Sequence, residues 1–146
     1  MMSETMQKSY IYTEAEINRV AQQLITFMPK CHMFTFTGPL GAGKTTLIRT
    51  ILQQCHITEN VTSPTFTYVN IYQNDKGQLF YHFDLYRVST LDDFLAAGFA
   101  EFLHVPDSWV FIEWPEVIMP LLKRDVCHCE IDYSNDKRKI TITTSE

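Results

Sequence analysis

The chain has 146 residues, which is the size of one ordinary domain. Hydrophobic residues make up 45 % and charged residues 20 % of it, and these near-average values exclude a disordered, collagen-like or coiled-coil protein. Twelve Lys and Arg against seventeen Asp and Glu give a net charge of −5, which argues against a protein that holds nucleic acid by bulk charge. We therefore expect a single domain over residues 1–146 that reaches any RNA through a partner.

Two absences in the sequence bear on its compartment. No apolar run approaches the ~20 residues that a membrane span needs, and residues 1–10 contain no apolar signal core. These features predict a cytoplasmic protein without membrane contact.

The Cys127-His128-Cys129 spacing suggests a metal site, but alternation in a strand places both cysteines on one face together with Ile131. Without a second Cys/His pair, we interpret these cysteines as core residues.

The first predicted element is a helix. Thr13-Glu14-Ala15-Glu16 matches a capping box, in which Thr13 and Glu16 satisfy each other's backbone N–H groups. Apolar residues then recur at helical spacing from Ile17 to Met28, and Pro29 marks the end of the helix.

The next elements form a strand, a glycine-rich turn and a helix. Residues 33–37 are β-prone and lack clean alternation, which is typical of a strand covered on both faces. Residues 38–43 form the turn, and residues 45–55 have a helical apolar face. This order is typical of the start of a nucleotide-binding α/β fold.

The remaining elements are mostly strands. The turn chemistry of residues 74–77 and 134–136 predicts two antiparallel hairpins. The predicted segments are strands 67–73 and 79–86, one or two short helices over 91–103 that break near Gly98, a buried strand 109–112, and strands 126–133 and 139–144.

One motif decides the protein class. Residues 38–45, GPLGAGKT, match the P-loop pattern G-x-x-x-x-G-K-[ST] at every fixed position. The glycines let backbone N–H groups point at a phosphate, and the following helix adds its positive N-terminal end. Lys44 then reaches the β- and γ-phosphates, and the Thr45 hydroxyl is a hard oxygen ligand for Mg²⁺. The predicted phosphate-binding residues are Gly38, Leu40, Gly41, Ala42, Gly43, Lys44, Thr45 and Thr46.

A P-loop enzyme also needs an acidic residue at the end of a neighbouring strand. Asp84 and Glu113 each follow an apolar run, where the carboxyl ends of strands in this fold face the ligand. We expect both to serve in catalysis with Lys44 and in metal binding with Thr45, and which of them contacts Mg²⁺ directly stays open.

Residues 63–66, Ser-Pro-Thr-Phe, occupy the chain position at which GTPases carry a γ-phosphate sensor. Ser63 or Thr65 is the candidate for that switch role. The alternative is a Ser-Pro turn that leads into a strand.

Two P-loop classes are disfavoured. The guanine motif N-K-x-D and the D-x-x-G motif are both absent, because Asp84 is followed by Leu85-Tyr86-Arg87. A small-molecule kinase usually has an arginine-rich lid, whereas the five arginines of this chain are dispersed.

The ordered motifs resemble the TsaE (YjeE) family of bacterial ATPases of threonylcarbamoyladenosine tRNA modification. Four segments carry the resemblance, and they are residues 38–46 (GPLGAGKTT), 61–66 (VTSPTF), 82–87 (HFDLYR) and 112–116 (IEWPE). Pro39 stands where many members are expected to have an acidic residue, and its side chain should point away from the phosphates. The resemblance implies an α/β, P-loop NTPase-like three-layer fold with a mixed, mainly parallel central sheet and antiparallel hairpins.

The resemblance also implies a function. The implied function is that of a Mg²⁺-dependent ATPase that is slow alone and supports the TsaD–TsaB pair. That pair transfers the threonylcarbamoyl group, so this chain would meet tRNA only through the complex. Thr13 and Arg138 would approach the nucleotide, although helix capping explains Thr13 equally well. Two other readings stay open, a small-molecule kinase and a nucleotide-gated binding module with incidental hydrolysis.

Overall fold

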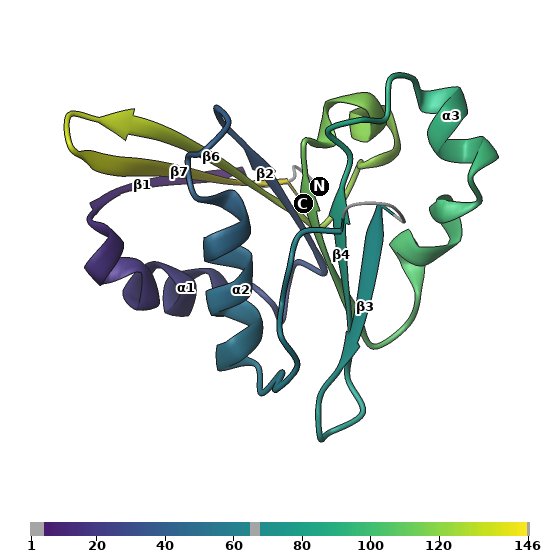
Figure 1. Ribbon diagram of the computed structural model, residues 1–146, viewed down its shortest axis with the longest axis horizontal. Helices are drawn as coiled ribbons and strands as arrows, with labels where there is room; N and C mark the ends of the chain where they lie inside the picture. The colour runs from purple at the N-terminus through teal and green to yellow at the C-terminus, as the bar shows by residue number, and fades with distance from the viewer. Residues whose placement is uncertain (1–4, 65–67, 146) are drawn as a thin grey trace.

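A computed structural model describes residues 5–64 and 68–145 of the chain. Within these residues, a seven-stranded sheet carries helices on both faces (Figure 1). The elements, with η for 3₁₀ helices, are β1 (Met6–Tyr12), η1 (Glu14–Glu16), α1 (Ile17–Ile25), β2 (Met33–Thr37), α2 (Lys44–Gln54), β3 (Val69–Gln73), β4 (Leu79–Asp84), α3 (Leu91–Ala96), η2 (Phe99–His104), β5 (Ser108–Glu113), η3 (Pro115–Leu121), β6 (Val126–Ser134) and β7 (Lys137–Ser145).

The sheet is parallel in its centre and antiparallel at both sides. Its strand order is β1-β7-β6-β2-β5-β4-β3. Strands β6, β2, β5 and β4 pair in parallel, whereas β3 pairs antiparallel with β4, and β7 pairs antiparallel with both β6 and β1. The mixed sheet and both hairpins are therefore confirmed, and the parallel part is the centre that contains the P-loop strand.

Two apolar layers flank the sheet, which confirms the three-layer architecture. Helices α1 and α2 cover one face, where Leu24 and Leu47 pack with Phe36 of β2. Helix α3 and the 3₁₀ helices η2 and η3 cover the other face, where Phe94 packs with Phe83 of β4. Strand β2 is buried on both faces because it lies between these layers, as its unbroken apolar pattern predicts.

The structure contains two elements that the sequence pattern does not predict. Strand β1 is an edge strand with largely exposed side chains, of which Tyr12 is buried, so it lacks the apolar alternation that marks a half-buried strand. Its backbone pairing with β7 holds it in place. The 3₁₀ helix η3 follows Trp114 and contains two prolines, which carry no helical pattern.

The first helix starts where it was predicted but ends earlier, since α1 stops at Ile25 and not near Met28, whereas the cysteines follow their prediction. The helix opens as η1 before α1, and the Glu16 carboxylate accepts hydrogen bonds from the Thr13 backbone N–H (3.0 Å) and hydroxyl (3.1 Å). Cys127 and Cys129 are buried in the core. Over the described ranges, no three His, Cys, Asp or Glu side chains gather into a metal site, and no helix is both long and apolar enough to cross a bilayer.

Gly38 allows the chain to pass close to strand β6. Its φ of 143° disfavours other residues, and a Cβ at this position would lie 2.2 Å from the Ile131 carbonyl oxygen.

We expect Gly38→Ala to lower the free energy of unfolding by more than Gly98→Ala, measured by urea denaturation. Gly98 also has a positive φ, 80°, but a Cβ there would meet open space. Gly98→Ala should therefore cost only about 1–2 kcal/mol, which is the backbone strain of a non-glycine residue at such a φ. Equal losses in the two variants would show that the contact with β6 is unimportant.

Candidate nucleotide-binding site

The glycine-rich loop links β2 to α2 as the motif predicts. Helix α2 begins after Gly43, whose φ of 95° turns the chain into the helix axis. The loop is closed by a hydrogen bond from the Ala42 N–H to the Pro39 carbonyl (3.1 Å), and the Leu47 N–H donates to the Gly43 carbonyl (3.0 Å). The free N–H groups of the first helical turn therefore face the loop, which is the arrangement that binds a phosphate.

Lys44 lies folded against the loop. Its ammonium donates to the carbonyl oxygens of Gly38 (2.6 Å) and Pro39 (3.0 Å), and it sits 4.0 Å from the centre of the Trp114 ring. Burial lowers the pKa of this ammonium, while the carboxylates of Glu113, Glu116 and Asp84 oppose the shift. Neutral carbonyls are weaker partners than phosphate oxygens, so the side chain is available to an anion in the loop.

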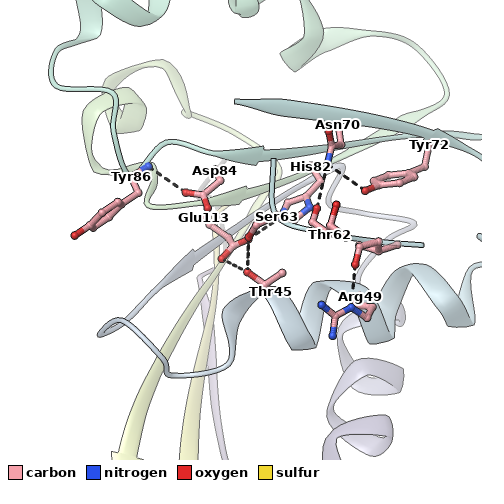
Figure 2. A network of polar contacts seen from close by, with 11 residues as sticks. Thr45, Arg49, Thr62, Ser63, Asn70, Tyr72, His82, Asp84, Tyr86 and Glu113 are labelled. Carbon is pink, nitrogen blue, oxygen red and sulfur yellow. Dashed lines mark hydrogen bonds and ion pairs between the residues drawn. The ribbon is translucent and has the colours of Figure 1, made fainter. Parts of the chain in front are cut away.

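A polar network joins the loop to the sheet through the buried Glu113 carboxylate (Figure 2). The Thr45 hydroxyl donates to both carboxylate oxygens, at 2.8 and 2.9 Å. His82 Nε2 lies 2.7 Å from Oε2 of the same carboxylate. Because the single Thr45 proton points to Glu113, the Ser63 hydroxyl, 3.0 Å away, donates to Thr45. Thr45 oxygen therefore keeps one lone pair for a cation.

Asp84 lies beside Glu113 because β4 and β5 are parallel and place these two residues in register. Burial raises the pKa of the Asp84 carboxyl, the hydrogen bond from the Tyr86 N–H (3.1 Å) opposes this, and the Glu113 charge adds to it. Two carboxylates and one hydroxyl at the loop provide the hard oxygen ligands that Mg²⁺ prefers. The residues present therefore fit that cation.

Two adjoining hollows share the loop residues Gly41–Gly43 and Thr46. One, of about 310 Å³, is lined by the loop and by Ser63, Asp84, Tyr86, Glu113 and Trp114. The other, of about 360 Å³, is lined by residues before α1 and on the β6–β7 hairpin, which are Tyr12, Thr13, Glu14, Ile17, Asp136, Lys137 and Arg138. The linings divide the candidate site into a part around the loop and the carboxylates and a part between the start of the first helix and the β6–β7 hairpin.

The structure places Thr13 and Arg138 in the second hollow. Arg138 donates through Nε to the Ala42 carbonyl (3.2 Å), and its guanidinium carbon lies 4.4 Å from the centre of the Tyr133 ring. The C-terminal hairpin therefore contacts the loop directly. Leu40 also lines the phosphate hollow, although its side chain is largely exposed.

The segment before Ser63 is fixed by side chains from two elements. Arg49 of α2 donates to the Val61 carbonyl (2.9 Å), and Asn70 of β3 donates to the Thr62 carbonyl (3.0 Å; Figure 2). These bonds hold Ser63 next to Thr45. Thr65, the other switch candidate, lies outside the described residues.

Two residues of this site, Trp114 and His82, received no predicted role, although both lie in segments that carry the family resemblance. Trp114, directly after Glu113, has a left-handed backbone (φ 56°) and lies beneath Lys44. His82 lies two residues before Asp84 on the same face of β4, and a polar residue within an apolar strand was the available signal.

The comparisons with known proteins agree with this geometry. The family model of the threonylcarbamoyl adenosine biosynthesis protein TsaE matches residues 11–140. This chain belongs to the TsaE family. The tRNA threonylcarbamoyladenosine biosynthesis protein TsaE of Haemophilus influenzae is 36% identical over 138 residues, which cover 91% of this chain and 86% of that one. The protein of the same name from Borreliella burgdorferi is 38% identical over 98 residues, covering 67% and 70% of the two chains.

A solved structure has the same fold. The crystal structure of Bacillus subtilis YdiB superposes with a TM-score of 0.71 at 28% identity, covering 100% of this chain and 89% of that one. The resemblance drawn from the four sequence segments is thus confirmed, and the family is one of tRNA threonylcarbamoyladenosine biosynthesis.

The raised pKa of Asp84 yields a test of the carboxylate pair. A raised pKa means that folding disfavours the ionised side chain, so the cost is present at neutral pH and absent below the ordinary carboxyl pKa of about 4. We expect Asp84→Asn, without Mg²⁺, to raise Tm at pH 7 by at most a few degrees, because solvent screens the charge of this half-buried group and ~1 kcal/mol corresponds to about 2–4 °C in a domain of this size.

The control for this measurement is Asp75→Asn in the exposed β3–β4 turn. Added Mg²⁺ should raise the Tm of the wild type more than that of Asp84→Asn. A lower Tm for Asp84→Asn at pH 7 would contradict the assignment of an unfavourable charge at this half-buried position.

Proposed function

We propose that this protein is a Mg²⁺-dependent ATPase that supports tRNA threonylcarbamoylation through the TsaD–TsaB pair, without transferring the group itself. The observation that carries the proposal is the convergence of the loop, Lys44 and Thr45 with two carboxylates from neighbouring parallel strands. The adjoining hollow with Thr13 and Arg138 provides room for the nucleoside.

Binding follows from the contacts of the loop. The β- and γ-phosphates of ATP occupy the hollow beside Gly41–Gly43, where backbone N–H groups and the start of α2 favour negative charge. Lys44 exchanges the carbonyls of Gly38 and Pro39 for phosphate oxygens. Thr45, Asp84 and Glu113 are the residues that would hold Mg²⁺, which supplies positive charge to the phosphoryl oxygens.

Hydrolysis needs a water in line with the γ-phosphorus and positive charge around the equatorial oxygens. Glu113 is placed to orient that water or to anchor the cation, because its carboxylate lies at the end of β5 and faces the loop. Lys44 and the loop N–H groups offset the charge that spreads in the transition state.

The contacts of Arg49 and Arg138 favour dependence on a partner. Arg49 and Arg138 donate to the carbonyls of Val61 and Ala42, and these bonds hold them in structural positions. A P-loop enzyme in which no arginine reaches the γ-phosphate hydrolyses slowly until a partner supplies one. The net charge of −5 makes TsaD–TsaB, rather than this chain, the component that holds tRNA.

ATP binding is tested by titration calorimetry with Mg²⁺·ATP. We expect Lys44→Ala to raise the Kd for Mg²⁺·ATP about 10- to 100-fold, because a charge-assisted hydrogen bond to phosphate contributes about 1.5–3 kcal/mol. Lys76→Ala, an exposed lysine in the β3–β4 turn, is the control and should bind like the wild type. No heat on titration of the wild type would refute a nucleotide-binding function.

Partner dependence is tested by the ATPase rate of the purified protein with and without TsaD–TsaB. We expect slow turnover alone and a large increase with the pair, since an arginine supplied in trans can contribute ~10³–10⁵ in rate. Threonylcarbamoylation of tRNA should require the wild type and fail with Lys44→Ala. Turnover at ordinary kinase speed, unaffected by TsaD–TsaB, would contradict the proposal.

A further inference from the structure

We propose that His82 is a positioning residue for hydrolysis, which holds the Glu113 carboxylate in the orientation that serves the reacting phosphate. The proposal rests on the ATPase function above and assigns a role to a residue that contacts neither the phosphate loop nor the nucleotide hollows directly. It starts from the 2.7 Å contact between His82 Nε2 and Glu113 Oε2 (Figure 2).

The position of His82 in β4 is one that an apolar residue would normally fill. Its neighbours in the strand, Tyr81 and Phe83, are buried, and its register partner on β5 is the buried Phe111. His82 itself is 0% exposed. An imidazole in such a place has lost its hydration, and this loss is unfavourable unless hydrogen bonds replace the water.

The imidazole of His82 is only half compensated. Because a carboxylate only accepts, the ring carries a proton on Nε2 and donates it to Glu113. Within the described part of the chain, its Nδ1 atom is buried without a hydrogen-bond partner. A residue that served packing alone would leave no such atom, since a leucine fills similar space and has no polar group. The contact with Glu113 is therefore the distinctive contribution of this histidine.

The contact fixes a carboxylate that has few other constraints. The last torsion angle of a glutamate side chain has a broad range of accessible values. The Thr45 hydroxyl contacts both carboxylate oxygens, so by itself it lets the carboxylate rotate about the axis of that contact. His82 approaches Oε2 from β4, whereas Thr45 approaches from α2. Two donors from different elements leave the carboxylate one orientation, with Oε1 bound by Thr45 alone.

The bond from His82 also persists independently of the loop. Thr45 is the residue that would ligate Mg²⁺, so its hydroxyl geometry changes with occupancy of the site, but His82 is part of a strand and is sealed from water. Glu113 thus stays oriented while ligands enter and leave. Residues that orient a catalytic or metal-binding group in this way typically contribute about 10–100-fold to activity.

The experiment compares His82→Leu, which removes the donor, with His82→Gln, whose amide nitrogen can occupy the place of Nε2. Rates are measured with Mg²⁺·ATP and TsaD–TsaB, ATP affinity by calorimetry, and stability by thermal unfolding. We expect His82→Leu to lower kcat about 10–100-fold with Kd for ATP within about threefold of wild type and an unchanged or higher Tm. His82→Gln should recover most of kcat, and His104→Gln in η2 is the exposed control.

A double-mutant cycle with Glu113→Gln separates positioning from packing. If His82 acts through Glu113, adding His82→Leu to Glu113→Gln lowers kcat little further. Proton NMR gives a readout independent of turnover, namely a slowly exchanging imidazole N–H signal that is absent from His82→Gln and shifted in Glu113→Gln.

The possible failures are distinct. An unchanged kcat in His82→Leu, equal losses in His82→Leu and His82→Gln, additive losses in the cycle, or no such N–H signal would overturn the role of His82 while the ATPase function stands. A wild type that hydrolyses no ATP even with TsaD–TsaB would refute the proposed function, and the positioning role with it.

Discussion

The site depends on the hydrogen bonds that the buried Glu113 carboxylate accepts. Glu113 ends β5, the strand beside the P-loop strand, and it receives the Thr45 hydroxyl from α2 and the imidazole of His82 from β4. Three elements that are far apart in the sequence are thus joined at one group. Because burying a carboxylate without partners is unfavourable, these donors offset part of the cost of placing Glu113 at the loop.

The C-terminal hairpin closes the other side of the loop. Gly38 passes close to Ile131 of β6, and Arg138 of β7 donates to the Ala42 carbonyl. The phosphate loop is therefore held between α2, the parallel strands and an antiparallel hairpin. The hollow next to Thr13 exists because β7 pairs with β1, which leads the chain to the start of the first helix.

Local signals predicted most elements because each signal acts over a few residues. The P-loop pattern identified the loop and α2, the turn residues located both hairpins, and the apolar runs that end in Asp84 and Glu113 located the central strands. Strand β1 escaped prediction because its order comes from pairing with β7, more than a hundred residues away. The role of Trp114 escaped prediction, although the residue lies in the IEWPE segment, because its contact with Lys44 depends on the left-handed backbone at that position.

The sequence by itself predicted the TsaE family, which the family match confirms, and it singled out Lys44, Thr45, Asp84 and Glu113 as candidate site residues, because motif spacing fixes which groups lie at the loop. Only the tertiary structure decided how the groups meet. It showed the donation from Thr45 to Glu113, the contact of Arg138 with the loop, and the burial of His82 beside the carboxylate. The physical reason is that strand register and hydrogen-bond direction are set by packing between distant segments, which no local pattern encodes.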